Sequence, residues 1–320
     1  MGIPSTRQWH APAVVSILSY VVLSSTTAYL NGILFGEYFF DYGVALIVLQ
    51  LALGLCMLEV GRFFNWVDVA AFTLERGNAV RVPSVLYFLN SYVSISVLQG
   101  MDSPLLDVFR RCVPLLVLLL TFCSDREYAS RARGVRGLVL AIVVTTAGLV
   151  LTGSSSLNLD PAVIPYGIAS LVLQSLCLVS LERTASSGQY SIVDMVYLNT
   201  FNGLILSLLA DLIVDESREA LTYFVTSSTF LFWLTLLSAL LSGALLQWAI
   251  IYCLVRNSAL TTCLVGGLKS VVEACVGREV MYGPAMGLVN WMGLGISCVG
   301  TGWYAMLKGK ASGTRLQQLL

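Results

Sequence analysis

Charged residues and histidine are scarce in this chain. Asp, Glu, Lys and Arg make up 11% of its 320 residues, against about 25% in a soluble globular domain. The one histidine, His10, precedes the first long apolar run, and the eight cysteines lie within or at the ends of apolar runs with no C-x-x-C pair. This composition excludes a soluble domain. It also argues against a disulfide framework or a cysteine–histidine metal site, so we expect no metal and no cofactor.

An excess of charge of either sign is also missing. The 18 basic residues balance the 18 acidic ones, so nothing attracts the chain as a whole to nucleic acid. No N-x-S/T sequon occurs. The apolar run from Ala13 is too long for a cleavable signal peptide and is not followed by a small-residue cleavage site. We therefore expect membrane lipid, and not nucleic acid, as the surroundings of the chain.

Long apolar runs are what the chain has in abundance. They are about 20 residues long, which is the length that crosses the hydrocarbon core of a bilayer as a helix. The shorter alternating segments of a membrane barrel are absent from the sequence. We predict an all-α polytopic membrane protein that forms a single membrane domain of ten transmembrane helices. The predicted spans are 12–32, 42–61, 82–100, 104–123, 136–153, 162–181, 191–213, 229–254, 258–277 and 285–306.

Basic residues outside the spans orient the chain. If the N-terminus is cytosolic, only Arg218 and Arg278 fall on the opposite side of the membrane. Because cytosolic loops carry the excess of Lys and Arg, both termini are predicted to be cytosolic. The basic residues then placed in the cytosol are Arg7, Arg62, Arg76, Arg81, Arg126, Arg131, Arg133, Arg136, Arg183, Arg256, Lys308, Lys310 and Arg315.

Two helix-turn-helix corners indicate an internal repeat. A shift of 155 residues, from Ser103 to Ser258, aligns SISVLQGMDSPLL (94–106) with AIIYCLVRNSALT (249–261). Each half of the chain holds five predicted spans, so the halves have opposite orientations. Inverted repeats are characteristic of alternating-access transporters. We predict a first repeat over 1–155 and a second over 156–320; the alternative is chance agreement between two hydrophobic turns.

Charges inside two of the spans are costly and therefore informative, since a charge at bilayer depth costs about 3 kcal/mol or more. Arg110 and Arg111 follow Asp107 by three and four residues, so Asp107 can pair with either of them. Lys269 lies about 18 Å along its span, which enters the membrane from the side opposite to the span of Arg110. Lys269 and Arg110 are therefore expected at a similar depth in the bilayer. These cations predict a shared pocket near the midplane for an anionic ligand such as a phosphate.

Two features near Lys269 have both structural and functional explanations. Gly266 and Gly267 allow either close packing of a neighbouring helix or close approach of a ligand. Glu273, four residues after Lys269, forms a structural ion pair with it or holds it while the site is empty.

Neutral polar residues in other spans are the remaining candidates. Tyr197, Asn199 and Asn202 can stack on and hydrogen-bond a planar base, or can bond neighbouring helices. Asn31 and Asn90 are interpreted as cavity lining. Further in-span amides, read mainly as packing contacts, are Gln50, Gln99, Gln174 and Gln247.

Two motifs resemble those of a known family. NSALTTCLVGGLKS (257–270) is similar to the ninth-helix motif of nucleotide-sugar transporters in the drug/metabolite transporter superfamily, above all the UDP-sugar branch, the D group of solute-carrier family 35. LQGMDSPLLDVFRRCVPLL (98–116) resembles the fourth-helix pattern of that branch. The span number and the inverted halves agree with this family over most of the chain.

The resemblance implies roles for single residues. Gly266 and Lys269 match the positions that contact phosphates and sugar, and Ser270 stands where many relatives have Asn. Tyr197 and Asn199 match the seventh-helix element that reads the base, with Thr200 in place of a second Asn. Other departures are Gly32 in place of a Lys after Asn31, GGLKS in place of the GALNK of GDP-mannose transporters, and Glu273.

The function that follows is nucleotide-sugar antiport. We expect a UDP-sugar to enter the Golgi lumen, or that of the endoplasmic reticulum, in exchange for UMP by alternating access, with no bond broken. The alternatives are a GDP-sugar transporter, a transporter-like scaffold or trafficking protein, and a membrane-embedded enzyme. The enzyme is disfavoured because the only histidine is near the terminus. The sequence leaves open whether the protein forms a homodimer.

Overall fold

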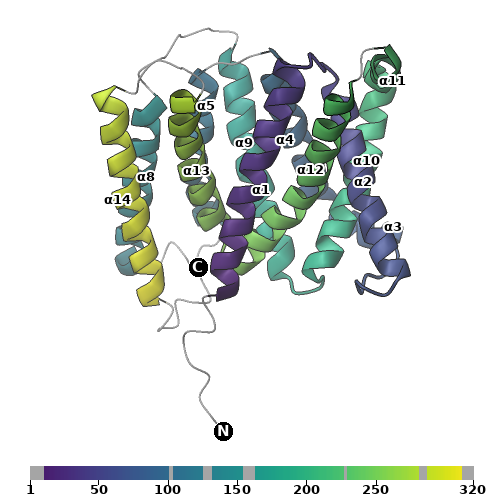
Figure 1. Cartoon of the computed structure of the whole chain (residues 1–320). Coiled ribbons are helices and arrows are strands. Elements are labelled where there is room, and N and C mark those ends of the chain that lie inside the picture. Colours follow the sequence, from purple (N-terminus) through teal and green to yellow (C-terminus); the bar gives the residue numbers. More distant parts are fainter. Residues whose placement is uncertain are drawn as a thin grey trace. The chain divides into compact units, whose positions relative to one another are not determined.

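Helices make up all of the regular structure in the part of the chain that the computed structural model describes, which confirms the predicted all-helical class. The described residues are 11–100, 104–124, 132–153, 163–226, 229–280 and 287–311. In Figure 1 the helices are α1 (Ala11–Gly36), α2 (Gly43–Phe63), α3 (Leu74–Ala79), α4 (Arg81–Gly100), α5 (Pro104–Arg111), α6 (Val113–Ser124), α8 (Ala132–Gly153), α9 (Val163–Ser186), α10 (Ile192–Val214), α11 (Glu216–Thr226), α12 (Phe230–Arg256), α13 (Ala259–Val280) and α14 (Leu288–Ala311).

Several of these helices are long and apolar enough to cross a membrane. Within the described ranges they are Pro12–Gly36, Gly43–Phe63, Ile164–Ser186, Ile192–Val214 and Phe230–Arg256. Shorter apolar helices cover Val113–Cys123, Arg136–Thr152 and Ala259–Lys269. The chain is therefore a polytopic helical membrane protein, and each predicted span overlaps a helix or a pair of helices of the structure.

The predicted span 104–123 is wrong as a single continuous helix. The structure divides it at Cys112 into α5 and α6. Pro114 explains the break, because it has no N–H to donate and its ring clashes with the carbonyl four residues earlier, that of Arg110. Around the break the hydrogen bonds tighten by one residue, with the Cys112 N–H donating to the Phe109 carbonyl at 3.0 Å. Arg110 and Arg111 therefore lie in the last turn of a short helix.

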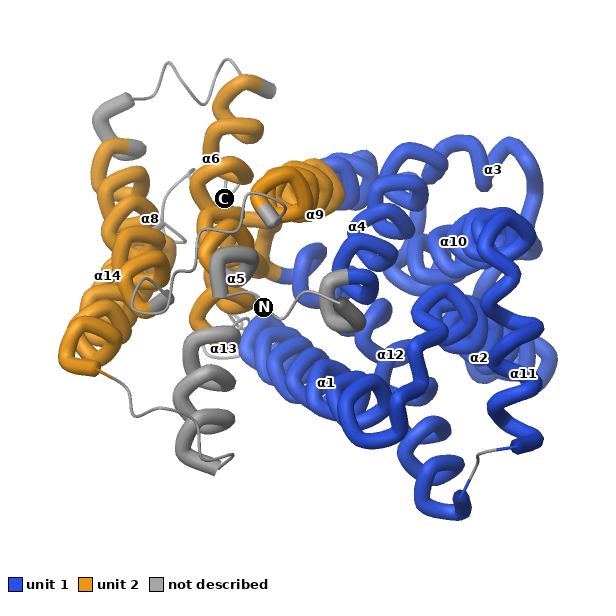
Figure 2. Tube along the Cα trace, turned by 90° about the horizontal axis from the view of Figure 1, so that it is seen from above, with its two compact units in different colours: residues 1–102, 180–256 blue, residues 103–179, 257–320 orange. Residues whose placement is uncertain are grey.

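The chain forms two compact units that alternate along the sequence (Figure 2). Unit 1 consists of Met1–Asp102 and Ser180–Arg256, and unit 2 of Ser103–Val179 and Asn257–Leu320. The chain passes from unit 1 to unit 2 at both helix corners that the sequence aligned, near Ser103 and near Ser258. Each unit thus takes segments from both predicted repeats, 1–155 and 156–320, and the inverted relation of these repeats stays a prediction.

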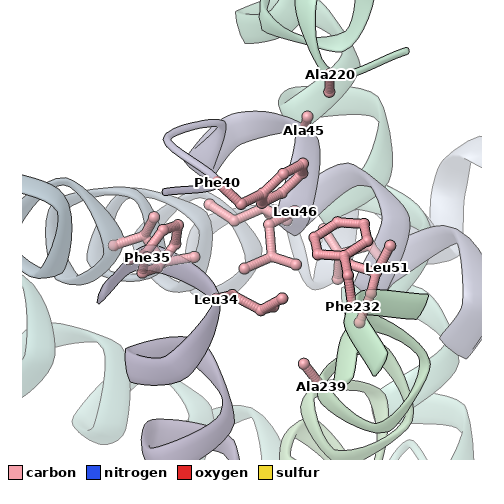
Figure 3. Close-up of a cluster of buried hydrophobic side chains, with 12 residues drawn as sticks. Leu34, Phe35, Phe40, Ala45, Leu46, Leu51, Ala220, Phe232 and Ala239 are labelled. Carbon is pink, nitrogen blue, oxygen red and sulfur yellow. The ribbon is translucent and has the colours of Figure 1, made fainter. Parts of the chain in front are cut away.

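An aromatic and aliphatic cluster joins α1, α2, α11 and α12 in unit 1. Phe40, Leu46 and Phe232 are fully buried in it, and the rings of Phe40 and Phe232 lie 5.8 Å apart (Figure 3). Leu34 from the end of α1 and Ala239 from α12 also belong to this cluster. Burial of large apolar side chains where α1 ends and α2 and α12 begin holds these helix ends together.

Glu216 of α11 caps the N-terminus of α2 from a distance in sequence. Its carboxylate accepts hydrogen bonds from the N–H groups of Val44 at 2.6 Å and Ala45 at 3.4 Å. No side chain at the start of α2 itself caps that end, so α11 supplies the acceptor that the first turn needs. Burial raises the pKa of the Glu216 carboxyl, outweighing the two N–H groups that lower it.

Glycine brings α8 and α14 into backbone contact in unit 2. A methyl group on Gly148 of α8 would lie 2.7 Å from the Gly293 carbonyl of α14, and one on Gly300 would lie 2.6 Å from the Thr145 nitrogen. Side chains separate most packed helices, so this contact depends on residues with no Cβ.

Replacing Gly148 with alanine is expected to lower the melting temperature of the detergent-purified protein by several degrees. The added methyl has only rigid backbone around it, and overpacking of this kind costs about 1–3 kcal/mol. Gly295→Ala on α14 is the matched control, because no atom lies within 4 Å of its added methyl. Equal melting temperatures for the two variants would contradict the packing argument.

Candidate functional site

The two arginines predicted to bind phosphate lie in unit 2. Arg110 donates from Nε to the hydroxyl of the fully buried Ser170 on α9 at 3.3 Å. Arg111 is 4% exposed and donates from a terminal nitrogen to the Leu149 carbonyl of α8 at 3.1 Å. Arg110 thus bonds α9 and Arg111 bonds α8, and a guanidinium group is suited to binding an anion by its planar fork of N–H groups.

Helix α13 meets the same residue of α8. A methyl group on Gly267 would lie 2.7 Å from the Leu149 side chain, so close helix packing is one role of this glycine. Gly266 and Lys269 are half-buried on the same helix. Lys269 lies ten residues after the start of the 22-residue α13, about 15 Å along it. Leu149 is therefore the point at which the fourth-helix and ninth-helix motifs converge within unit 2.

The predicted ion pairs of this region cannot be followed in the structure. Asp107, Ser270 and Glu273 lie on α5 and α13, but their side chains are outside the described residues. The pairing of Asp107 with an arginine and that of Glu273 with Lys269 stay predictions.

Several buried or half-buried amides in unit 1 have ends without a hydrogen bond. Asn199 of α10 is 0% exposed, and neither end of its carboxamide has a hydrogen-bond partner among the described residues. The side-chain oxygens of Asn31 on α1, which is 6% exposed, and of the half-buried Asn90 on α4 also have none there. A buried amide with no partner is destabilising, so these positions are candidates for contact with a polar ligand or with water.

Tyr197 is placed differently from Asn199. Its ring is 2% exposed and packs against Val69, Val80 and Leu198. Its hydroxyl donates to Glu59 of α2 at 2.6 Å, and Arg62 forms a salt bridge with the same carboxylate at 3.2 Å. In this structure Tyr197 therefore joins α10 to the end of α2, and its ring does not face an open site. The predicted reading of a base by Tyr197 stays a prediction.

Side-chain contacts hold the segment between α2 and α4 against α10. Arg76 forms a salt bridge with Asp194 at 2.6 Å, and Phe72 stacks on Phe201 with ring centroids 3.9 Å apart. Asn202 donates from its amide to the Gly77 carbonyl at 2.9 Å and to the Ser84 hydroxyl at 3.3 Å. Asn202 is thus a structural contact, which favours interhelical bonding over base recognition at this position.

The candidate residues differ in chemistry. The predicted cations Arg110, Arg111 and Lys269 lie in unit 2 and suit a phosphate, while the predicted carboxamides Asn31, Asn90 and Asn199 lie in unit 1 and suit a nucleobase or a sugar. No group of three or more His, Cys, Asp or Glu side chains that could hold a metal is found where the structure is described. Near Glu59, an open depression of about 440 Å³ is lined by Glu59, Val60, Arg62, Phe63 and Phe64.

Proteins with sequences similar to this chain include several that are named as transporters of UDP-sugars or nucleotide sugars. The UDP-galactose/UDP-glucose transporter 7 of Arabidopsis thaliana is 23% identical over 299 residues, which cover 92% of this chain and 90% of that one. The UDP-sugar transporter sqv-7 of Caenorhabditis elegans is 22% identical over 95% of this chain and 91% of its own length. The human nucleotide sugar transporter SLC35D2 is 22% identical over 92% of this chain and 86% of its own. This chain is a distant homologue of nucleotide-sugar transporters.

A solved crystal structure supports the fold of this transporter homologue. It superposes with a TM-score of 0.62 at 14% identity and covers 95% of this chain and 99% of its own. No protein-family model matches the chain. The resemblance that the two motifs predicted is therefore confirmed by whole-chain similarity.

Residues of the N-S-A-L-T-T motif of this transporter homologue cap the N-terminus of α13 and bond it to α14. The Ser258 hydroxyl accepts from the Thr261 N–H at 3.2 Å, as an N-cap does. The Thr261 hydroxyl lies 2.9 Å from the hydroxyl of Tyr304 on α14 and accepts from Lys308 at 2.7 Å. Lys308 also donates to the Asn257 carbonyl at 3.0 Å. These bonds set the start of α13 and hence the position of Lys269 along it.

Sequence reasoning missed Glu59, Arg76 and Asp194. Glu59 is a carboxylate inside the predicted span 42–61, two residues from its end and three residues before Arg62, so a charge within an apolar span would have marked it. Ser191 and Asp194 form a capping box at the start of α10, a pattern that is readable from sequence. The pairing of Asp194 with Arg76 had no such signal, because 118 residues separate them.

Proposed function

We propose that this chain is a nucleotide-sugar antiporter that exchanges a UDP-sugar for UMP. The observation that supports the proposal is that Arg111 bonds the Leu149 carbonyl and Gly267 packs on the Leu149 side chain, so the cation-bearing helices α5 and α13 both contact α8 within unit 2. A diphosphate needs more than one cation at membrane depth, and an unpaired ligand charge there is costly. The transporter homologues supply the substrate class.

The proposed ligand contacts are divided by chemistry. Lys269, with Arg110 or Arg111, neutralises the phosphates, and Gly266, Gly267 and Ser270 allow the ligand close to α13. Asn199 hydrogen-bonds the base, and Asn31 and Asn90 are further proposed ligand contacts.

Alternating access is the proposed mechanism. The chain crosses between the two units near Ser103 and near Ser258, as expected if ten spans form two inverted repeats that rock about a central site. Transport is proposed as coupled exchange, in which one site carries the UDP-sugar on the way in and UMP on the way out.

The proposed location is the Golgi membrane, with the endoplasmic reticulum as the alternative. Both termini are proposed to face the cytosol, because thirteen of the basic residues outside the spans then lie on that side. Nucleotide sugar enters from that side, and nucleoside monophosphate returns to it.

The test is counterflow with the purified protein in proteoliposomes preloaded with UMP, using a panel of UDP- and GDP-sugars. We expect UMP to drive uptake of at least one UDP-sugar and GMP to drive little. A parallel thermal-shift series with UMP, CMP and GMP measures binding alone, since a ligand that binds the folded state raises its melting temperature. No uptake and no shift with any nucleotide would overturn the proposal and favour a scaffold.

A further inference from the structure

The open depression near Glu59 lies where the apolar helix α2 ends. Its volume is about 440 Å³, and it is lined by Glu59, Val60, Arg62, Phe63 and Phe64. The part of α2 that is long and apolar enough to cross a membrane ends at Phe63. The depression is therefore expected at the level of the lipid headgroups, where amphipathic aromatic side chains gather.

The Arg62 guanidinium has donors left over in this depression. Its Nη1 donates to the Glu59 carboxylate at 3.2 Å and to the Tyr197 hydroxyl at 3.5 Å. Neither Nη2 nor Nε donates to any residue in the described part of the chain. The side chain is 37% exposed. Its remaining N–H groups form a fork that suits a phosphate.

Glu59 supplies the opposite charge at a fixed position. Its carboxylate accepts from the hydroxyl of the buried Tyr197 at 2.6 Å, which ties it to α10. The Glu59 side chain is nevertheless 41% exposed. The depression thus presents one cation and one anion side by side. A ligand that carries both signs is complementary to this pair, whereas a purely anionic ligand is repelled by Glu59.

An apolar strip of α2 leads to the depression. Met57, Val60 and Phe64 follow one another by three and four residues, so they share one face of the helix. All three side chains are exposed. On a helix that crosses a bilayer, such a face meets the acyl chains of lipids. A ligand of the depression can therefore have an apolar chain next to its charged group.

Aromatic rings stand at the end of this strip. The chain reverses at Asn65, which has a left-handed φ of 55°, and the Trp66 N–H donates to the Gly61 carbonyl at 2.8 Å. Asparagine adopts this conformation more readily than most residues. The reversal stacks Trp66 on Phe64 with ring centroids 5.2 Å apart, and both rings are exposed. Exposed aromatic faces attract ammonium groups by cation–π interaction.

We propose that this depression binds the headgroup of a zwitterionic phospholipid from the leaflet in which α2 ends. The lipid phosphate accepts from Nε and Nη2 of Arg62. The headgroup ammonium lies against Glu59 and Phe64, and an acyl chain follows Val60 and Met57. Phosphatidylcholine and phosphatidylethanolamine share this chemistry. The site uses none of the residues proposed to contact the nucleotide sugar, so it stands or fails separately from the proposed function.

Native mass spectrometry of the detergent-purified protein tests the proposal. The protein is titrated with phosphatidylcholine, phosphatidylethanolamine and phosphatidylglycerol that carry the same acyl chains. We expect at least one of the two zwitterionic lipids to be retained about two- to fivefold better than phosphatidylglycerol, which is the effect of an exposed ion pair. The melting temperature in the presence of each lipid is the second readout, since a bound ligand raises it. Equal or better retention of phosphatidylglycerol would overturn the proposal.

Substitutions assign the binding to this depression. Glu59→Gln removes the anion, so the preference for zwitterionic lipid is expected to disappear. Arg62→Gln is expected to weaken binding of all three lipids, and Arg62→Lys, which keeps the charge but loses the fork, is expected to weaken it less. Arg256→Gln is the matched control, because Arg256 also lies in the last turn of a long apolar helix but packs over the Tyr252 ring at 5.7 Å. It is expected to keep the wild-type preference.

Two results would show that the lipid binds elsewhere. One is a folded Glu59→Gln variant that keeps the wild-type preference for zwitterionic lipid. The other is wild-type retention of all three lipids by whichever of the two Arg62 variants folds.

Discussion

Replacing Lys269 with alanine is expected to abolish UMP-driven uptake of UDP-sugar in proteoliposomes while the purified protein keeps its fold. Lys269 is half-buried near the middle of α13, where its interaction with a phosphate is weakly screened by water. Truncating one partner of a buried charged contact costs about 2–5 kcal/mol, which weakens ligand affinity by more than about thirtyfold. The measurement is initial uptake rate, with the UMP-induced thermal shift as the readout of binding.

Lys308 provides the matched control for Lys269. It is also a unit 2 lysine, but its ammonium bonds the Asn257 carbonyl and the Thr261 hydroxyl at the start of α13. Lys308→Ala is expected to lower the melting temperature and to leave the UMP-induced shift in place. Lys269→Arg keeps the charge but changes its shape, so a partial loss of affinity is expected. Wild-type uptake by Lys269→Ala would remove Lys269 from the phosphate site.

The spans were predictable because their signal is local. Lipid leaves a helix as the only open-chain way to satisfy the backbone, so each apolar run predicted a helix, including α10 and α12 within a few residues. The break at Cys112 followed from Pro114, which was visible in the sequence, but the length and hydropathy of the run 104–123 concealed it. The helices α3 and α11 lie between the predicted spans, because helices of 6 and 11 residues are too short to give the apolar run of a membrane span.

The candidate site was predictable only in part. Motif resemblance selected Lys269 and Asn199, and both are buried or half-buried inside helices. Tyr197 came from the same motif, yet its hydroxyl bonds Glu59 across 138 residues of sequence, a pairing that no local pattern specifies. Gln247 was read as a packing contact, since one sequence does not show which end of a buried amide finds a partner. Hydrogen-bond satisfaction is a tertiary property, and it distinguishes Asn199 from Asn202 where spacing does not.

Replacing Asn199 with leucine is expected to abolish the UMP-induced thermal shift without lowering the melting temperature of the ligand-free protein. Both ends of its fully buried carboxamide lack partners among the described residues, so an apolar side chain of similar volume removes an unsatisfied polar group and loses no hydrogen bond. Such an exchange is neutral or stabilising. If Asn199 bonds the base with both ends, its removal costs about 1–3 kcal/mol of binding, and uptake falls by about tenfold or more.

Asn202, one turn further along α10, is expected to behave in the opposite way. Its amide donates to the Gly77 carbonyl and the Ser84 hydroxyl, so Asn202→Leu leaves these two groups without their donor and lowers the melting temperature by several degrees. The fraction of Asn202→Leu that stays folded is expected to show a normal UMP-induced shift. Two asparagines on one helix thus separate stability from binding. A loss of stability in Asn199→Leu with an unchanged shift would show that Asn199 serves packing, and the base contacts would then have to come from another helix.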